Sequence, residues 1–82
     1  MISRKKWKVC GKAVKVKQRK RGLWLTIKGT LSNDSYIQKS TIDCWLPCSL
    51  CDGRRNYYKK FDVVGVLAFE GKDTYFLTEE VL

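Results

Sequence analysis

The sequence predicts an all-β domain: a small five-stranded closed barrel with at most one short helical turn, between the third and fourth strands. Apolar and polar residues alternate with a period of two along much of the chain, and helical spacing is not sustained anywhere. Gly11 interrupts the first strand, where a bend would curve the sheet. With 82 residues the chain forms one domain, over residues 1–82, and closure removes edges that so small a sheet could not otherwise protect.

The first two strands are predicted over residues 7–16 and 23–31, joined by a basic turn over Lys17–Gly22. In the first strand the apolar residues change sides at Gly11, which predicts a bulge or a sharp bend at that position. The second strand alternates regularly, so its apolar residues are expected to share one face.

The remaining elements are, in order, a mobile polar loop over 32–40, a third strand over 41–46, a helical turn over 47–53, a basic connector over 54–60, a fourth strand over 61–69, a tight turn over 70–73 and a fifth strand over 74–82. Pro47 suits a first helical position and Gly53 a helix stop. The fourth strand is apolar on both faces, which predicts a central place in the sheet.

Three segments carry a resemblance to a known fold. Val9–Val14 is similar to a glycine-bent first strand, Lys60–Leu67 to a fourth strand with a V-x-G-x-L run, and Gly71–Leu77 to the hairpin leading into a fifth strand. Together they resemble the OB-fold, the five-stranded barrel that binds oligonucleotides. The resemblance covers almost the whole chain, and an SH3-like barrel is the alternative fold.

The resemblance implies a binding groove across the second and third strands, between the loop joining strands one and two and the loop joining strands four and five. The first loop here contains Lys17, Arg19, Lys20 and Arg21, from which we expect phosphate contacts. The second loop carries Lys72 between acidic residues, so a weaker contribution is expected from it.

Trp24 and Trp45 are predicted to point away from the core. They alternate with the expected core residues of the second and third strands: Leu23, Leu25, Ile27, Ile42, Cys44 and Leu46. Exposed indoles on adjacent strands suit base stacking, which is worth about 1–3 kcal/mol per base. Thr26, Lys28 and Thr41 share that face and offer donors to phosphates or base edges. Alternatively, the indoles cover the barrel end or a protein interface.

The charge is strongly positive and unevenly distributed. The chain has 17 Lys and Arg against 8 Asp and Glu, with no His. Residues 1–41 hold 12 of the basic residues and one acid, whereas residues 42–82 hold five basic residues and seven acids. Such an asymmetric field favours a polyanionic partner, a generally basic protein without such a ligand being the alternative.

A second basic and aromatic cluster lies on the connector, at Arg54, Arg55, Tyr57 and Tyr58. Both tyrosines are candidates for base stacking, and the alternative is that one of them plugs the core.

The four cysteines give an incomplete zinc pattern. Cys44, Cys48 and Cys51 are spaced C-x3-C-x2-C, and Cys10 is a candidate fourth ligand. Zinc sites of this kind use paired ligand spacings, but the second pair is missing and no His replaces it. We therefore expect no bound metal or other cofactor, and we expect Cys10 and Cys44 to be small core residues.

The sequence does not favour an enzyme. Without His the commonest general base is absent, and no phosphate-cradling loop, nucleophile elbow or paired-carboxylate cluster occurs. No secretory signal or membrane-spanning run is visible, so we expect a cytoplasmic protein. In that reducing environment its four cysteines are expected to be free thiols.

These features predict a single-stranded DNA-binding protein that is largely independent of base sequence, with a role in DNA replication inferred by analogy. An RNA-binding OB protein is one alternative. A module that docks onto a protein of a replication or translation complex is another, with residues 79–82 available for a protein partner or for self-association.

Overall fold

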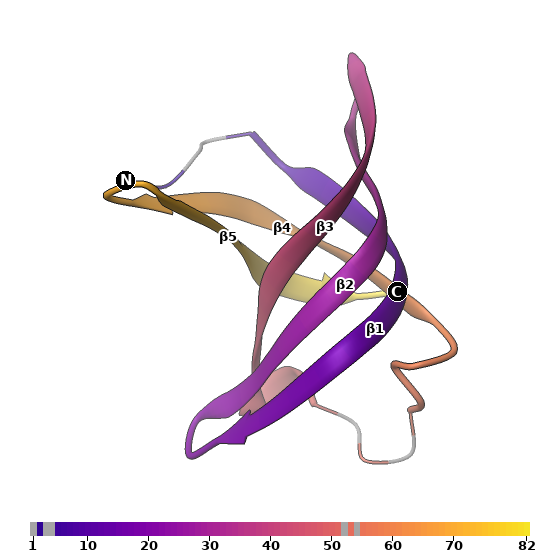
Figure 1. Ribbon diagram of the computed structural model, residues 1–82, viewed down its shortest axis with the longest axis vertical. Coiled ribbons are helices and arrows are strands. Elements are labelled where there is room, and N and C mark those ends of the chain that lie inside the picture. The colour runs from indigo at the N-terminus through magenta and orange to yellow at the C-terminus, as the bar shows by residue number, and fades with distance from the viewer. Residues whose placement is uncertain (1, 3–4, 52, 54) are drawn as a thin grey trace.

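The computed structural model of the protein describes residues 2, 5–51, 53 and 55–82. Five strands make up most of it: β1 (Trp7–Arg19), β2 (Gly22–Asn33), β3 (Tyr36–Pro47), β4 (Phe61–Glu70) and β5 (Asp73–Val81). They form a closed barrel in the order β1-β2-β3-β5-β4, with β1 also pairing with β4 (Figure 1). The predicted all-β, closed five-stranded barrel is confirmed.

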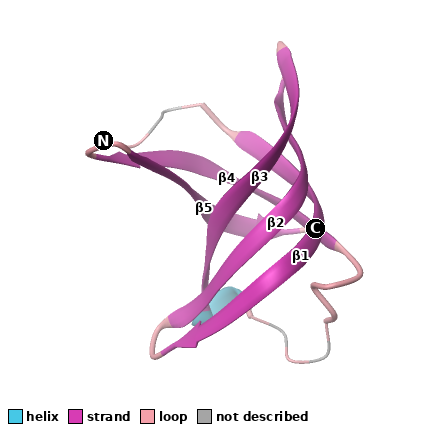
Figure 2. Ribbon diagram, in the orientation of Figure 1, coloured by secondary structure: helices cyan, strands magenta, loops and turns pink. Residues whose placement is uncertain are grey.

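Closure of the barrel depends on one short parallel contact. β3 and β5 are paired only at Cys44–Phe76 and Trp45–Leu77, whereas every other pair of neighbours is antiparallel. The single helical turn, the 3-10 turn η1 (Cys48–Leu50), follows β3 directly, inside the predicted range (Figure 2). Across the described residues, no helix has the length and apolar character needed to cross a membrane.

The prediction of a mobile loop over residues 32–40 is wrong. β2 and β3 remain paired from Gly22–Pro47 to Asn33–Tyr36, leaving a turn of Asp34 and Ser35. The Ser35 N–H donates to Asn33 Oδ1 over 2.9 Å, which closes this turn. Continuous backbone pairing thus overrides the loop-like composition, and the resulting hairpin projects beyond the rest of the barrel (Figure 1).

The bulge in β1 lies three residues after the predicted position. The register with β2 shifts between Ala13 and Lys15, so Val14 is the extra residue, and its side chain is 57% exposed. Gly11 has a different role: it lies opposite Gly29, and a Cβ on either residue would collide with the backbone of the other strand. These two glycines let β1 and β2 approach closely where the sheet coils.

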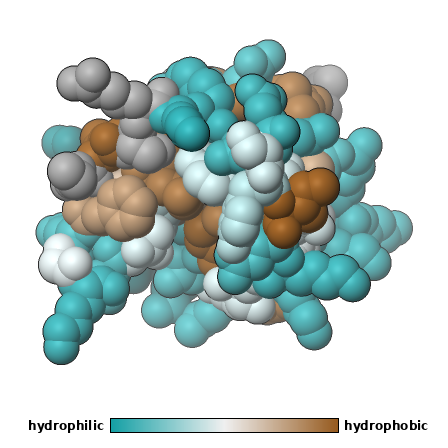
Figure 3. Space-filling model, turned by 90° about the horizontal axis from the view of Figure 1, so that it is seen from above, coloured by the Kyte–Doolittle hydropathy of each residue, from teal (hydrophilic) through white to brown (hydrophobic). Residues whose placement is uncertain are grey.

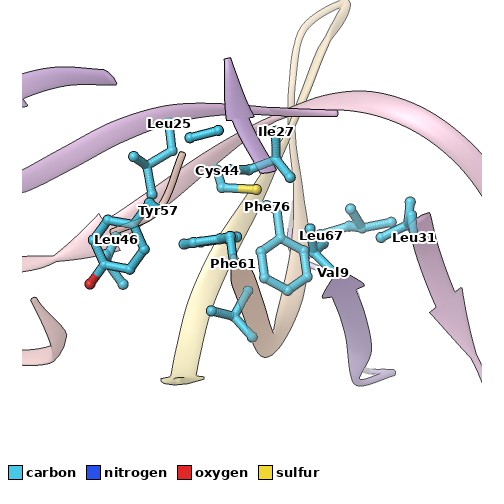
Figure 4. Close-up of a cluster of buried hydrophobic side chains, with 12 residues drawn as sticks. Val9, Leu25, Ile27, Leu31, Cys44, Leu46, Tyr57, Phe61, Leu67 and Phe76 are labelled. Atoms are coloured by element: carbon cyan, nitrogen blue, oxygen red, sulfur yellow. The ribbon is translucent and has the colours of Figure 1, made fainter. Parts of the chain in front are cut away.

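The core fills the barrel with side chains from all five strands (Figure 4). Its members are Val9, Ala13, Leu25, Ile27, Leu31, Cys44, Leu46, Tyr57, Phe61, Val63, Leu67 and Phe76. The predicted alternation of β2 and β3 is confirmed here, because Leu25, Ile27, Cys44 and Leu46 are almost completely buried. β4 is buried along most of its length. Ile2 forms an isolated antiparallel β-bridge with Ala68 of this strand.

The connector between η1 and β4 seals one end of the barrel. The Ala13 N–H donates to the Tyr57 carbonyl over 2.8 Å, and the Tyr57 ring packs edge-on against Phe61 with centroids 5.4 Å apart. The face of the molecule seen from above is mostly hydrophilic, with separate apolar patches (Figure 3).

Candidate nucleic-acid interface

The outer side of β1, β2 and β3 carries Trp24 and Trp45, and we refer to it as the tryptophan face. Cross-strand partners form rows on this face, because paired residues point to the same side of a sheet. From one end to the other the rows are Lys17–Trp24–Trp45, Lys15–Thr26–Asp43, Lys12–Lys28–Thr41 and Cys10–Thr30–Lys39.

Three aromatic rings meet at one end of the tryptophan face. Trp24 lies 5.1 Å from Trp45, between ring centroids, with an interplanar angle of 55°. It also contacts Tyr75 of β5 edge-on, with centroids 5.4 Å apart. All three side chains are half-buried, neither in the core nor fully in solvent. Trp24 is therefore the centre of an aromatic platform outside the core. The predicted outward direction of the two tryptophans is confirmed, but their rings are half-buried and not fully exposed.

Basic side chains occupy the rows beside this platform. The cations on the tryptophan face are Lys8, Lys12, Lys15, Lys17, Arg19, Lys28 and Lys39. The bulge at Val14 produces this arrangement, because it brings the odd-numbered Lys15, Lys17 and Arg19 to the same side as the even-numbered Lys8 and Lys12. Asp43 is the acidic residue in the four cross-strand rows of this face.

Two surface hollows adjoin Trp24, one on each side. The basic hollow is lined by Lys15, Lys17, Arg19, Trp24, Thr26 and Asp43. The acidic hollow is lined by Trp24, Asp43, Glu70, Asp73, Thr74 and Tyr75. Asp43 stands between them, and its carboxylate accepts a hydrogen bond from the Thr26 hydroxyl over 3.0 Å. The charged residues that line the two hollows are thus mainly basic on one side of Trp24 and acidic on the other.

A third hollow continues the tryptophan face along the projecting β2–β3 hairpin. Its lining residues are Lys28, Gly29, Thr30, Lys39, Ser40 and Thr41. The predicted donors Lys28 and Thr41 therefore adjoin each other here, together with Lys39, which the residue pattern did not single out.

Not all predicted site residues join this face. Lys20 and Arg21 form the exposed turn between β1 and β2, at the same end as the aromatic platform, and the Arg21 carbonyl accepts from the Cys48 N–H over 2.8 Å. Lys72 is exposed in the β4–β5 turn. The acids on either side of it, Glu70 and Asp73, line the acidic hollow.

The predicted cluster on the connector is separate from the tryptophan face. Tyr57 belongs to the core with 8% of its surface exposed, so its proposed stacking role is wrong and the alternative, a plug for the core, is correct. Tyr58 is exposed, and Arg55 donates to the Leu82 carbonyl over 2.8 Å. The connector bonds β1 on the side away from β2. Arg54 lies outside the described residues.

The cysteines do not gather into a metal site. Cys44 is fully buried in the core, as predicted, and burial raises the pKa of its thiol strongly. Cys10 is not a core residue: it lies half-buried beside Asp62, and burial, followed by the hydrogen bond to Asp62, raises its pKa. Burial also raises the pKa of Cys51, while Cys48 is exposed. Among the described residues, no group of three or more metal-ligating side chains is present.

Sequence reasoning missed several residues of this face. Tyr75 alternates with the buried Phe76, which marks it as outward-facing, but its contact with Trp24 requires the parallel pairing of β3 with β5. Lys12 and Lys15 depend on the position of the bulge, which the residue pattern placed at Gly11.

Comparisons with known proteins found no match: no family model, no curated protein and no solved structure is significantly similar to the chain. Its function is therefore inferred from the chemistry of its own residues.

Proposed function

We propose that the protein binds single-stranded nucleic acid, DNA in preference to RNA, across the tryptophan face and largely independently of base sequence. The observation that carries this proposal is the placement of half-buried aromatic rings directly beside rows of lysines on one wall of the barrel. A cationic groove with aromatic platforms is the usual chemistry of single-strand binding without sequence readout.

Phosphate contacts supply the electrostatic part of the affinity. Lys15, Lys17 and Arg19 project side by side from one strand and line the basic hollow next to Trp24. Successive outward residues of a strand are about 6–7 Å apart, similar to the spacing of phosphates along an extended single strand. Binding releases counterions from these phosphates, so the affinity falls as the salt concentration rises.

Base stacking supplies the second part. Trp24 and Trp45 retain accessible surface although they pack against each other, so each ring offers a partner for an unstacked base. A duplex would not expose base faces to these rings, and no described residue lies in an α-helix that could enter a major groove. These considerations favour a single strand over a duplex.

The experiment is a fluorescence titration that uses the position of the third tryptophan. Trp7 lies away from the platform, packed against the core and edge-on to Tyr36. In a Trp7→Phe variant, emission comes only from Trp24 and Trp45. Titration with poly(dT) at about 50 mM and 200 mM salt is expected to quench this emission, with markedly weaker affinity at the higher salt concentration.

Unquenched emission with no affinity for poly(dT) at either salt concentration would overturn the proposal. Competition between DNA and RNA oligomers of equal length tests the preference for DNA. Tighter binding of the RNA oligomer would favour the alternative, in which the tryptophan face binds RNA. A protein-interaction module instead predicts that Trp24→Ala abolishes a partner complex without changing the oligonucleotide affinity.

A further inference from the structure

The acidic hollow is the feature of the tryptophan face that general affinity for a polyanion does not explain. Resting on the proposed function, we infer that a bound strand lies with its phosphates over the basic hollow and its base edges over the acidic hollow. This orientation favours bases with an exocyclic amino group, namely cytosine, adenine and guanine, over thymine and uracil.

The orientation follows from the sign of the charges on the two sides of Trp24. Lys15, Lys17 and Arg19 attract the backbone to the β1 side, while Glu70 and Asp73 repel it from the β5 side. At physiological ionic strength the screening length is about 8 Å, so charges lining the hollows next to Trp24 are only partly screened from the phosphate of a nucleotide stacked on this ring. A nucleotide stacked on Trp24 therefore has one favourable direction for its phosphate.

The base edge then points toward carboxylates that are free to accept hydrogen bonds. Within the described part of the chain, Asp43, Glu70 and Asp73 form no ion pair. The Thr26 hydroxyl occupies one oxygen of Asp43 and holds this carboxylate at the boundary between the hollows. Ionised carboxylates only accept hydrogen bonds, so they match amino groups.

The four bases differ in what they present to such an edge. Cytosine offers its N4 amino group, for which Asp and Glu are suitable acceptors, and adenine and guanine also carry amino groups. Uracil and thymine place carbonyl oxygens where cytosine has its amino group, and two acceptors facing each other are repelled. Stacking on Trp24 tolerates every base, so the carboxylates are the discriminating element.

The best-matched pair of probes is oligo(dC) and oligo(dU) of equal length. Using uracil in place of thymine avoids a difference in the methyl group between the two bases. We expect the wild-type protein to bind oligo(dC) about fivefold or more tightly than oligo(dU), from the discrimination typical of base-edge hydrogen bonds. The isosteric triple variant Asp43→Asn, Glu70→Gln and Asp73→Asn is expected to lose this ratio and to bind oligo(dU) more tightly than the wild type does, because phosphate repulsion is removed.

Glu80→Gln is the matched control, since it removes an exposed acid from the far end of β5 and should leave the ratio unchanged. Equal wild-type affinities for both oligomers, or a ratio that survives in the triple variant, would overturn the inference while leaving the proposed function intact. Failure to bind either oligomer would overturn the proposed function itself.

Discussion

Trp24 and Trp45 lie directly opposite each other on β2 and β3, with ring centroids 5.1 Å apart and planes inclined by 55°. Backbone register places the two residues opposite each other, and their rings pack together. Such a preorganised platform loses little conformational entropy when a ligand stacks on it. The contact of Trp24 with Tyr75 makes Trp24 the central ring of the cluster.

Trp24→Ala is expected to weaken binding of oligo(dT) by about 1–3 kcal/mol, the value of one stacked base. Trp45→Ala should cost the same or less, because Trp45 lies at the edge of the platform. Fluorescence anisotropy of a labelled oligomer measures both affinities. Tyr58→Ala is the aromatic control, since Tyr58 is exposed on the separate connector, and a loss as large as that of Trp24→Ala would place the site elsewhere.

Neutralising the β1 lysines that line the basic hollow should reduce the dependence of affinity on salt. Each of Lys15→Gln and Lys17→Gln is expected to lower the slope of log affinity against log salt by about 0.7, if each lysine contacts one phosphate of a single strand. The slope is measured by titrations at several salt concentrations. Lys59→Gln, on the connector, should leave it unchanged, and identical slopes in all variants would exclude the basic hollow as the phosphate site.

Replacing Thr78 by valine should stabilise the fold. Thr78 is 4% exposed, and its hydroxyl oxygen has no hydrogen-bond partner among the described residues. Thr78→Val removes an unsatisfied buried polar atom while preserving the shape, so the free energy of unfolding is expected to rise by about 1 kcal/mol. Urea denaturation checks this value, with the exposed Thr74→Val as control. A destabilised Thr78→Val variant would indicate that the hydroxyl is satisfied.

Gly29→Ala should destabilise the barrel by about 1–3 kcal/mol, as overpacking does, because the added Cβ would strike the Cys10 carbonyl. Gly53→Ala is the matched control: apart from its chain neighbours, no described atom would lie within 4 Å of a Cβ at that position, so its effect should stay within about 0.5 kcal/mol. Thermal unfolding of the two variants gives the comparison. Equal stabilities would contradict the close approach of β1 and β2.

Burial of Cys44 makes stability depend on alkaline pH. Its pKa is raised in the folded protein, so above about pH 8.5 the unfolded chain loses a proton that the folded chain retains. The stability that comes from burying the protonated Cys44 thiol is therefore fully present below that pH. Above it, the free energy of unfolding declines by up to about 1.4 kcal/mol per pH unit. Urea denaturation from pH 7 to pH 10 should show a smaller decline for Cys44→Ala than for the wild type. Cys48→Ala, at an exposed position, should follow the wild type.

Much of the candidate site could be predicted because it depends on local alternation. Trp24 lies between residues that are buried in the core or packed against it, so its outward direction follows from the period of a strand. Alternation does not predict which tyrosine of the connector is buried. Tyr57 and Tyr58 are adjacent and chemically alike, yet Tyr57 packs on Phe61 and Tyr58 is exposed. The docking of the connector on the barrel distinguishes them, because the Tyr57 carbonyl accepts a hydrogen bond from the Ala13 N–H of β1, more than 40 residues earlier in the chain.

The order of residues alone specifies the strand content, the inward and outward sides of β2 and β3, and the concentration of positive charge in the first half of the chain. Packing of the folded barrel sets where β1 bulges, and hence that Lys15 and Lys17 stand beside Trp24. It also brings Tyr75, Glu70 and Asp73 to the same ring through the β3–β5 closure. This division arises because alternation is a property of neighbouring residues, whereas register and closure depend on pairing between segments distant in the chain.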